Sequence, residues 1–199
     1  MKMKKQENFN FIEEYKKSWN FIRESKNFIY SVIGIFFIFS LIGFFITTPT
    51  IIAEQILKFI EELLLKTKDM SQFELTKFIF FNNVQSSFFG IVFGIFLGIF
   101  PLIAVVTNGY VLGFVASLVV DSEGILALWR LFPHGIFELP AIFISLGLGL
   151  KIGTFIFQRE KFESLKKYSL NSLRVFLFIV LPLLIIAAII EGGLIYLVS

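Results

Sequence analysis

The chain has 199 residues, of which 56% are hydrophobic and 28 are phenylalanine, and its mean hydropathy is +0.83. This composition excludes an ordinary soluble domain and indicates an integral membrane protein. The net charge is only +3, and with no cysteine and one histidine the chain has no disulfide, no thiolate chemistry and no set of ligands for a structural zinc site.

We predict an all-α fold, a polytopic transmembrane bundle of about five spans with interfacial amphipathic helices. A basic amphipathic segment at 1–26 comes first. Its aromatic residues Phe11, Tyr15 and Trp19 recur at near-helical spacing, so we expect it to lie at the cytoplasmic membrane surface. The transmembrane domain covers 27–199, with spans at about 27–47, 80–101, 105–120, 134–157 and 175–198 and an external amphipathic segment at 50–77.

The second span carries Gly90, Gly94 and Gly98 at intervals of four residues, a pattern that allows a neighbouring helix to approach closely in lipid. Pro101 should kink or interrupt the chain. The residues at 107–109, Thr-Asn-Gly, then predict a tight turn, because Asn-Gly favours positive φ. The apolar run at 102–120 is short, so a re-entrant segment is the alternative to a crossing.

The distribution of Lys and Arg predicts the orientation. The N-terminal segment holds seven of them and a basic loop at 158–174 holds five, against five in the segments placed outside. Lys151, in the fourth span, lies near the inner side and can snorkel to water. The positive-inside rule therefore predicts a multi-pass protein of the cell membrane, with a cytoplasmic N-terminus and an external C-terminus. A re-entrant 102–120 would place the basic loop outside, against that rule.

The start of the fourth span contains the single histidine. His134 and Glu138 are four residues apart and share a helical face. We expect both to point inward, because a lipid-facing ionisable group costs about 2.5–3.5 kcal/mol. Pro133 suits a first helical turn, and Pro140 should kink the helix or mark its true start. A His–Glu hydrogen bond that pins the packing is one interpretation, and a proton or ion path is the other.

The predicted functional and packing centre consists of Pro133, His134, Gly135, Glu138, Arg130, Asn82, Asn83, Asn108 and Gly109. Arg130 or His134 would compensate a buried Glu138. The H-x-x-x-E spacing is weak as a metal motif, and further ligands would have to come from the asparagines at 82–83, Asp121 or Glu191. The chain has no nucleophile motif, phosphate loop or dinucleotide fingerprint, so we expect no enzyme, no cofactor and no nucleic-acid partner.

These residues resemble the stage II sporulation protein M family of integral membrane proteins over roughly 78–155. The strongest part is Pro-His-Gly at 133–135 with Glu138, which leads into a glycine-spaced helix and follows Asn-Gly at 108–109. The resemblance implies a non-enzymatic membrane scaffold. The sporulation member anchors a pair of peptidoglycan-degrading proteins during engulfment, and relatives occur in bacteria and archaea that do not sporulate.

Two functions follow as hypotheses. The first is a membrane scaffold that recruits protein partners through the segment at 50–77 or through the bundle. The alternative is a transporter or channel-like component, with an ion or small-solute site at His134 and Glu138 and a broken helix at 101–109. The expected partners are the lipid bilayer, proteins of unknown identity and a second copy of the chain. A homodimer is expected because glycine faces on two spans offer more packing surface than one small bundle consumes.

Overall fold

The computed structural model describes the backbone of residues 10–198 and, within that range, every side chain except those of 129–134 and 195–198. The described part of the chain is helical and contains no strand. Its elements are α1 (Phe11–Glu24), α2 (Lys26–Phe45), α3 (Thr50–Thr67), α4 (Gln72–Val92), the 3₁₀ turn η1 (Phe93–Ile95), α5 (Ile99–Glu123), the 3₁₀ segment η2 (Ile125–Leu131), α6 (Phe132–Gly153), the 3₁₀ turn η3 (Thr154–Phe157), α7 (Lys161–Val175), the π-helical turn η4 (Phe176–Val180) and α8 (Leu181–Val198).

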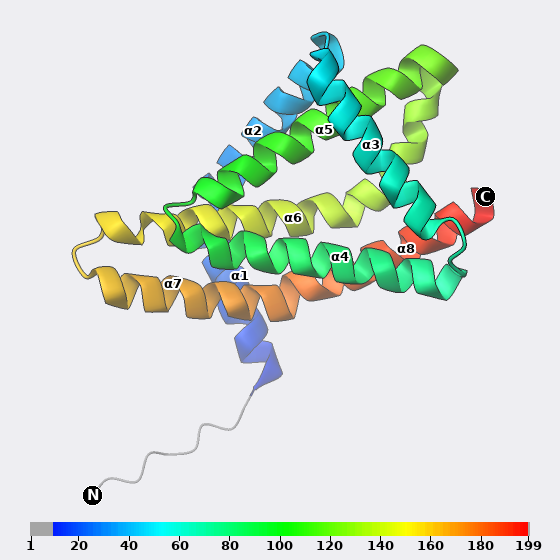
Figure 1. Ribbon diagram of the computed structural model, residues 1–199. Coiled ribbons are helices and arrows are strands. Elements are labelled where there is room, and N and C mark those ends of the chain that lie inside the picture. Colours follow the sequence, from blue (N-terminus) through cyan, green and yellow to red (C-terminus); the bar gives the residue numbers. More distant parts are fainter. Residues whose placement is uncertain (1–9, 199) are drawn as a thin grey trace, which may run out of the picture.

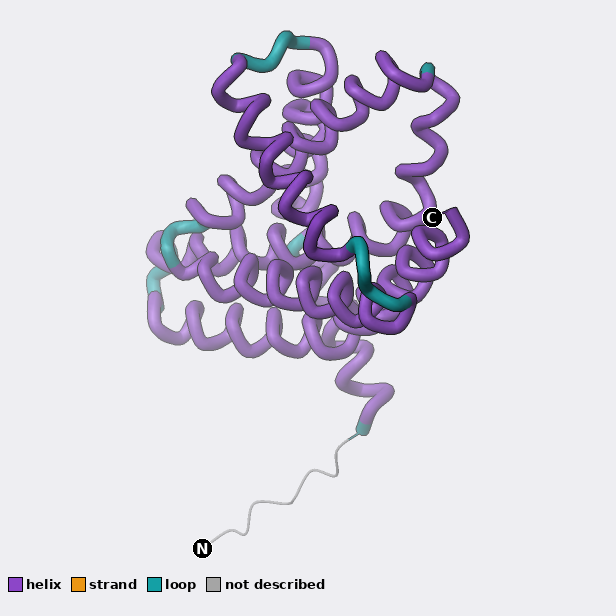
Figure 2. Tube along the Cα trace, turned by 45° about the vertical axis from the view of Figure 1, so that its right-hand side comes forward, coloured by secondary structure: helices purple, strands orange, loops and turns teal. Residues whose placement is uncertain are grey.

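The helices form two groups (Figure 1). One group is the pair α2 and α5, and the other contains α4, α6 and the rod made by α7, η4 and α8. The groups are close where α4 turns into α5 and diverge toward the opposite end (Figure 2). There α3 joins α2 to α4, and η2 joins α5 to α6. We call this the α3 end of the bundle and the opposite one the α1 end, because α1 packs there against α7.

Five helical segments in the described residues are long and apolar enough to cross a membrane, as the composition predicted. They are Lys26–Phe45, Gln72–Ile95, Ile99–Glu123, Gly135–Phe157 and Lys161–Leu194. The all-α fold class is therefore confirmed, and the chain is a membrane protein. The third segment has the length of a full crossing, unlike the short run expected at 105–120.

Glycines bring α2 and α5 into backbone contact. Gly109 lies against the carbonyl of Phe36, and Gly113 lies against the carbonyl of Ser40. A Cβ atom at either glycine would overlap the carbonyl oxygen, so even alanine would force the helices apart. The residue numbers of the contacting pairs increase together along both helices. α2 and α5 therefore run in the same direction.

The glycine spacing of the second span forms a similar contact between α4 and α6. Gly94 lies against Gly149, Gly149 lies against the carbonyl of Gly90, and Gly153 lies against the backbone of Gly98. This pair is also parallel, and the predicted role in close helix packing is confirmed. Because these faces are occupied within one chain, a homodimer would need a surface other than the one that suggested it.

The tight turn expected at 107–109 is wrong. The positive φ angles lie instead at Leu97 (58°) and Gly98 (73°), where α4 and η1 turn into α5, and at Gly124 (86°), which follows α5. Residues 107–109 lie inside α5, where the Asn108 amide donates to the Ala104 carbonyl (2.7 Å) and satisfies itself within the helix. Gly109 serves close approach to α2 rather than a turn. Pro101 falls in the first turn of α5, where its missing N–H is not needed for a helical hydrogen bond.

The expected basic loop at 158–174 is mostly helix. α7 begins at Lys161 and runs into the last span without an intervening loop. Between Lys161 and Leu181 the sequence has no glycine or proline to end a helix. Pro182 follows the π-helical turn η4, a local widening that accommodates the proline, since its ring cannot donate to the preceding turn. Pro140 likewise lies inside α6 and does not mark its start.

The external segment at 50–77 is divided between two helices. α3 ends at Thr67, and α4 begins at Gln72 rather than near 80. A capping box sets this start, because the Ser71 hydroxyl accepts from the Glu74 N–H while the Glu74 carboxylate accepts from the Ser71 N–H (2.9 Å). Of the expected apolar stripe on α3, Ile56 is buried, but Phe59 is 59% exposed.

Candidate functional site

The first part of the predicted centre lies at the start of α6. Pro133 and His134 occupy its first turn, and Arg130 lies in η2, but the side chains of all three lie outside the described residues. The expected contact between His134 and Glu138 therefore remains a prediction. Gly135 has open surroundings, since a Cβ there would meet only the side chain of Leu139, at 3.4 Å. Close packing does not explain this glycine.

Glu138 lies one turn further along α6 and is partly buried. A second carboxylate, on α8, lies near it. Glu191 lies close enough for the two negative charges to interact. One carboxylate oxygen of Glu191, Oε2, is buried and has no hydrogen-bond donor. The sequence indicates Glu191 only as one of several residues that could complete a set of metal ligands. The signal for it is simple, because it is an ionisable residue inside an apolar span.

Three further polar side chains point into the interior between α4, α6 and α8. Asn83 and Ser87 are buried and lie one turn apart on α4. Ser145 is fully buried on α6, seven residues after Glu138 and therefore on nearly the same face. The hydroxyls of Ser87 and Ser145 have no hydrogen-bond partner. We call these three residues, together with Glu138 and Glu191, the polar junction.

Contacts between the helices fix the register of the polar junction. Gly90 of α4 meets Leu146 and Gly149 of α6. Counting back along these two parallel helices places Asn83 level with Glu138. At the α3 end, Gly192 of α8 lies against Thr76 of α4, which puts Glu191 beside the first turns of α4. The polar side chains thus follow one another from the α3 end toward the middle of the bundle.

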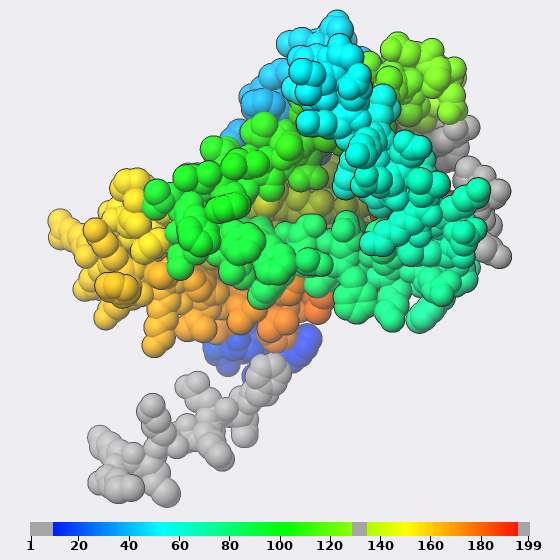
Figure 3. Space-filling view, in the orientation of Figure 1, coloured from blue at the N-terminus to red at the C-terminus, as the bar shows by residue number. Residues whose placement is uncertain are grey.

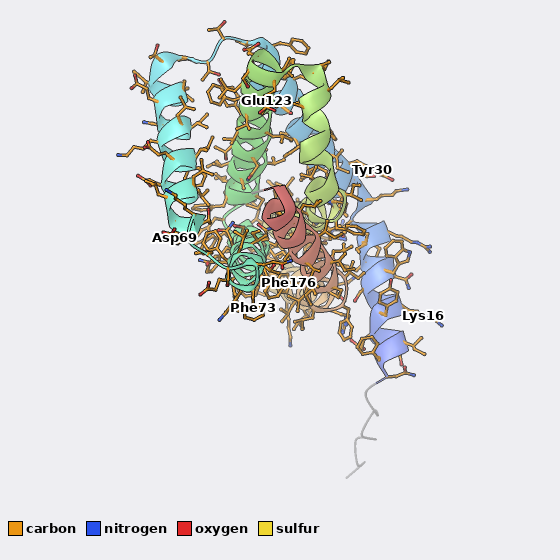
Figure 4. All side chains as sticks on the ribbon, turned by 90° about the vertical axis from the view of Figure 1, so that its right-hand side faces the viewer. Lys16, Tyr30, Asp69, Phe73, Glu123 and Phe176 are labelled. Atoms are coloured by element: carbon orange, nitrogen blue, oxygen red, sulfur yellow. The ribbon has the colours of Figure 1, made fainter. Side chains whose placement is uncertain are left out.

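A second feature of the α3 end is a groove of about 630 Å³ between α3 and α4. Its lining is charged and aromatic: Lys66, Asp69, Met70, Glu74, Lys77, Phe78, Phe81, Asn82 and Gln85. The Lys66 ammonium lies 4.9 Å from the centre of the Phe78 ring. Viewed from the α3 end, Asp69 and Phe73 lie where α3 meets α4, away from Glu123 at the end of α5 (Figure 4). The predicted site residue Asn82 belongs to this groove and not to the polar junction.

The remaining predicted site residues do not join either feature. Asn108 is exposed on α5, and Gly109 is buried against α2. The structure thus divides the predicted centre into packing residues at 108–109, a groove residue at 82, and junction residues at 83 and 138.

Lys151 forms a separate buried cluster at the α1 end. It is only 7% exposed, so it does not snorkel to water. Its ammonium donates to the Ser25 hydroxyl (3.0 Å) and lies 4.2 Å from the centre of the Phe21 ring and 5.4 Å from that of Tyr168. The contacts tie the junction of α1 and α2 to α6 and α7.

The chemistry available to the polar junction is that of hard oxygen donors. It offers two carboxylates, an amide and two hydroxyls, without a thiol. Among the described residues, no three His, Cys, Asp or Glu side chains converge as metal ligands. These groups can hold a proton or accept hydrogen bonds.

Comparison with known families gives a match over most of the chain. The model of the family Stage II sporulation protein M matches residues 32–194, which covers all five membrane-length segments at least in large part. No curated protein and no solved structure matches the chain. The matched range includes the polar junction and the groove.

Proposed function

Because the chain belongs to the stage II sporulation protein M family, we propose that it is a non-enzymatic membrane scaffold that holds a partner protein in the groove between α3 and α4. The resemblance to this family implies a scaffold role. The observation that supports it in this structure is the groove. Its lining combines the aromatic rings of Phe78 and Phe81 with charged side chains. Apolar anchors beside polar groups are typical of protein-binding surfaces.

A partner protein can reach the groove only if the groove lies outside the bilayer. The directions of the helices support such a position. Five crossings in alternation require the first and third spans to run one way and the second and fourth the other. α2 and α5 are parallel, and α4 and α6 are parallel, in agreement with this pattern. We place the N-terminus and α7 in the cytoplasm and α3 outside, at the surface of the cell membrane, with the C-terminus also outside.

α3 itself supports a binding role, because it uses little of its surface for the fold. Of its residues only Ile56 is buried, while Ile51, Leu64 and Leu65 are more than 60% exposed. In the space-filling view α3 forms the surface between the end of α2 and the start of α4 (Figure 3). A helix that packs so lightly on its own protein has apolar surface left for a partner or for the membrane interface.

Charge reversal at the groove tests the proposal. We expect Lys66→Glu combined with Lys77→Glu to abolish co-purification of the partner from native membranes, because both lysines line the groove. Lys58→Glu is the matched control, since Lys58 is exposed on α3 away from the groove and should retain the partner. Equal recovery of the same partner with all variants, or equal loss in the control, would contradict the proposal.

The polar junction favours ion transport as the second candidate function. The sequence predicted that a broken helix at 101–109 would be part of the transport site. This prediction is wrong, because α5 is continuous there. What remains is the carboxylate pair within the bundle. Cation uptake into proteoliposomes that disappears in Glu138→Gln would support transport, and tight vesicles with no uptake above protein-free controls would contradict it.

A further inference from the structure

We infer that α1 binds anionic phospholipids through one exposed face. On this face Ile12, Tyr15 and Trp19 enter the membrane interface, and Lys16 and Arg23 contact lipid phosphates. We call these five residues the lipid face of α1. The sequence predicted only that this segment lies at a membrane surface, whereas the structure indicates which side of the helix does so and which class of lipid it selects. The inference is independent of the groove between α3 and α4.

The first argument is the level at which α1 lies. Arg174 of α7 donates a hydrogen bond to Glu14 of α1. One turn further along the same rod, the ring of Phe178 lies 5.1 Å from the ring of Phe11. The last membrane-length segment, Lys161–Leu194, has 34 residues, whereas about 20 are enough for a crossing. After Arg174 its next charged residue is near the far end, so the hydrophobic part begins there. α1 therefore contacts the last span at the edge of the hydrocarbon.

The second argument is the direction in which the sides of α1 face. Glu14 meets the arginine at the edge of the hydrocarbon, whereas Phe11 meets the phenylalanine one turn deeper. Passing around the helix from Glu14 to Phe11 therefore leads toward the membrane. At 3.6 residues per turn, Tyr15, Trp19 and Ile12 come next in that direction, and all three are exposed. The protein itself leaves these apolar and aromatic side chains uncovered at the level of the membrane interface.

The third argument is that the charges of α1 are divided between its two sides. Lys16 and Arg23 border the exposed aromatic residues and form no ion pair within the described part of the chain. Figure 4 shows Lys16 on the side of α1 that is turned away from the other helices. The Arg23 guanidinium lies 6.0 Å from the centre of the Trp19 ring. Glu13 and Glu24 fall on the opposite side by their helical positions, so the lipid face carries positive charge alone.

This combination identifies the ligand as an anionic phospholipid. Tyrosine and tryptophan prefer the level of the lipid headgroups, where the ring is covered and its polar atom stays wet. Basic side chains at that level are attracted to a negatively charged leaflet, and no carboxylate of the lipid face opposes them. A zwitterionic headgroup would gain little from this separation of charges, because it has no net charge.

The experiment uses Trp19 to report the lipid beside it. The chain has two tryptophans, so Trp129→Phe leaves Trp19 as the only one. This full-length protein is reconstituted into vesicles of equal parts phosphatidylcholine and phosphatidylglycerol. In each preparation only one of the two lipids is brominated, near the headgroup end of its acyl chains, and bromine quenches tryptophan fluorescence on contact. We expect brominated phosphatidylglycerol to quench Trp19 roughly 2- to 5-fold more than brominated phosphatidylcholine.

Variants of the lipid face locate the cause of this preference. Lys16→Gln combined with Arg23→Gln should make the two brominated lipids quench equally, because the aromatic residues remain and the positive charge does not. Both side chains are exposed, so the fold should be retained. Lys17→Gln is the matched control, since Lys17 lies on the opposite side of α1, where it pairs with Glu13, and it should keep the preference. Raising the ionic strength should weaken the preference in the parent, because salt screens exposed charges.

Three outcomes would overturn the inference. The first is equal quenching by the two lipids in the parent, which means that α1 does not select anionic lipid. The second is quenching of Trp19 by neither lipid, which means that water or another protein covers this face. The third is a preference for phosphatidylglycerol that persists in the Lys16 and Arg23 double variant, which places the selecting residues elsewhere.

Discussion

The two groups of helices differ in how they are held together. The α2–α5 pair is joined by glycines that admit a facing carbonyl, and its buried side chains are apolar. The α4–α6–α8 group uses the same glycine contact at the α1 end but places carboxylates, an amide and hydroxyls in its interior toward the α3 end. Apolar packing and glycine contacts account for the first group. In the second group, the buried hydroxyls of Ser87 and Ser145 and Oε2 of Glu191 have no hydrogen-bond partner in the described part of the chain.

The largest expected effect comes from breaking the α2–α5 contact. Gly113→Ala should destabilise the protein by about 1–3 kcal/mol, because its Cβ would overlap the Ser40 carbonyl and the backbone of Phe44. Gly34→Ala on α2 is the control, since nothing lies within 4 Å of a Cβ there. Thermal unfolding in detergent measures both. If the two variants unfold at the same temperature, α2 and α5 do not touch through Gly113.

The next effect concerns the turn that links the two groups. Gly98→Ala should cost about 1–2 kcal/mol, because its φ of 73° is left-handed and its Cβ would lie 3.2 Å from the Leu150 side chain. Leu97→Gly should act in the opposite direction, since glycine adopts the φ of 58° without strain. Denaturation midpoints provide the comparison. A stabilising Gly98→Ala would place the turn elsewhere.

A smaller, local effect is expected where α1 joins the second group. The Arg174 guanidinium donates to Glu14 (2.5 Å), as does the Lys17 ammonium (3.0 Å). The hydrogen bond from Lys17, then that from Arg174, holds the Glu14 pKa below its usual range. The contact is therefore fully present at pH values above the ordinary carboxyl pKa of about 4.3 and weakens as the pH falls toward the lowered value.

Hydrogen exchange of the α1 amides measures this attachment. Exchange should accelerate beyond its intrinsic pH dependence on acidification, while Glu14→Gln should exchange fast already at neutral pH. Glu13→Gln is the control, because Glu13 is 61% exposed and its ion pair with Lys17 lies within α1 itself. Unchanged protection of α1 in Glu14→Gln would show that the ion pair does not hold the helix.

The smallest effect is expected at Lys151, which is buried but has a hydroxyl and aromatic rings as its contacts. Lys151→Met keeps the length of the side chain and should change stability by less than about 1 kcal/mol, since burying the charge is itself unfavourable. Lys151→Ala should destabilise more, because it leaves a cavity. Unfolding in denaturant ranks the two. A larger loss for methionine than for alanine would show that the charge is essential.

The sequence predicted the class of fold well, because hydropathy and length are strong signals. The number of membrane-length helices and the glycine contact of Gly90 and Gly94 with another helix are both observed. The prediction of a turn at 107–109 was wrong because Asn-Gly also occurs inside helices, where the asparagine amide bonds to a helix carbonyl and the glycine allows close helix packing. Here a helical hydrogen bond satisfies Asn108, and α2 requires Gly109 for close approach.

The site was predicted only in part. Spacing along one helix identified Glu138, but it could not show that Glu191, from a helix more than fifty residues later, shares the same interior. Ser87 and Ser145 give no signal in sequence, since serine is common in membrane helices and only the fold shows that their hydroxyls are free. The relative positions of residues on three helices depend on the helix register, which is set by the glycine contacts and cannot be predicted from the sequence.

The most direct test of the polar junction is a disulfide across the α3 end, in a chain that has no cysteine of its own. The Cβ of Thr76 lies 3.0 Å from an ideal Cβ at Gly192, below the range of about 3.5–4.5 Å that a disulfide requires, so a slight separation of the two helices would allow the bond. In native membranes, Thr76→Cys with Gly192→Cys should cross-link almost completely under mild oxidation, and Thr76→Cys with Leu177→Cys should not. The reverse result would place Glu191 away from α4 and leave the polar junction without its outer carboxylate.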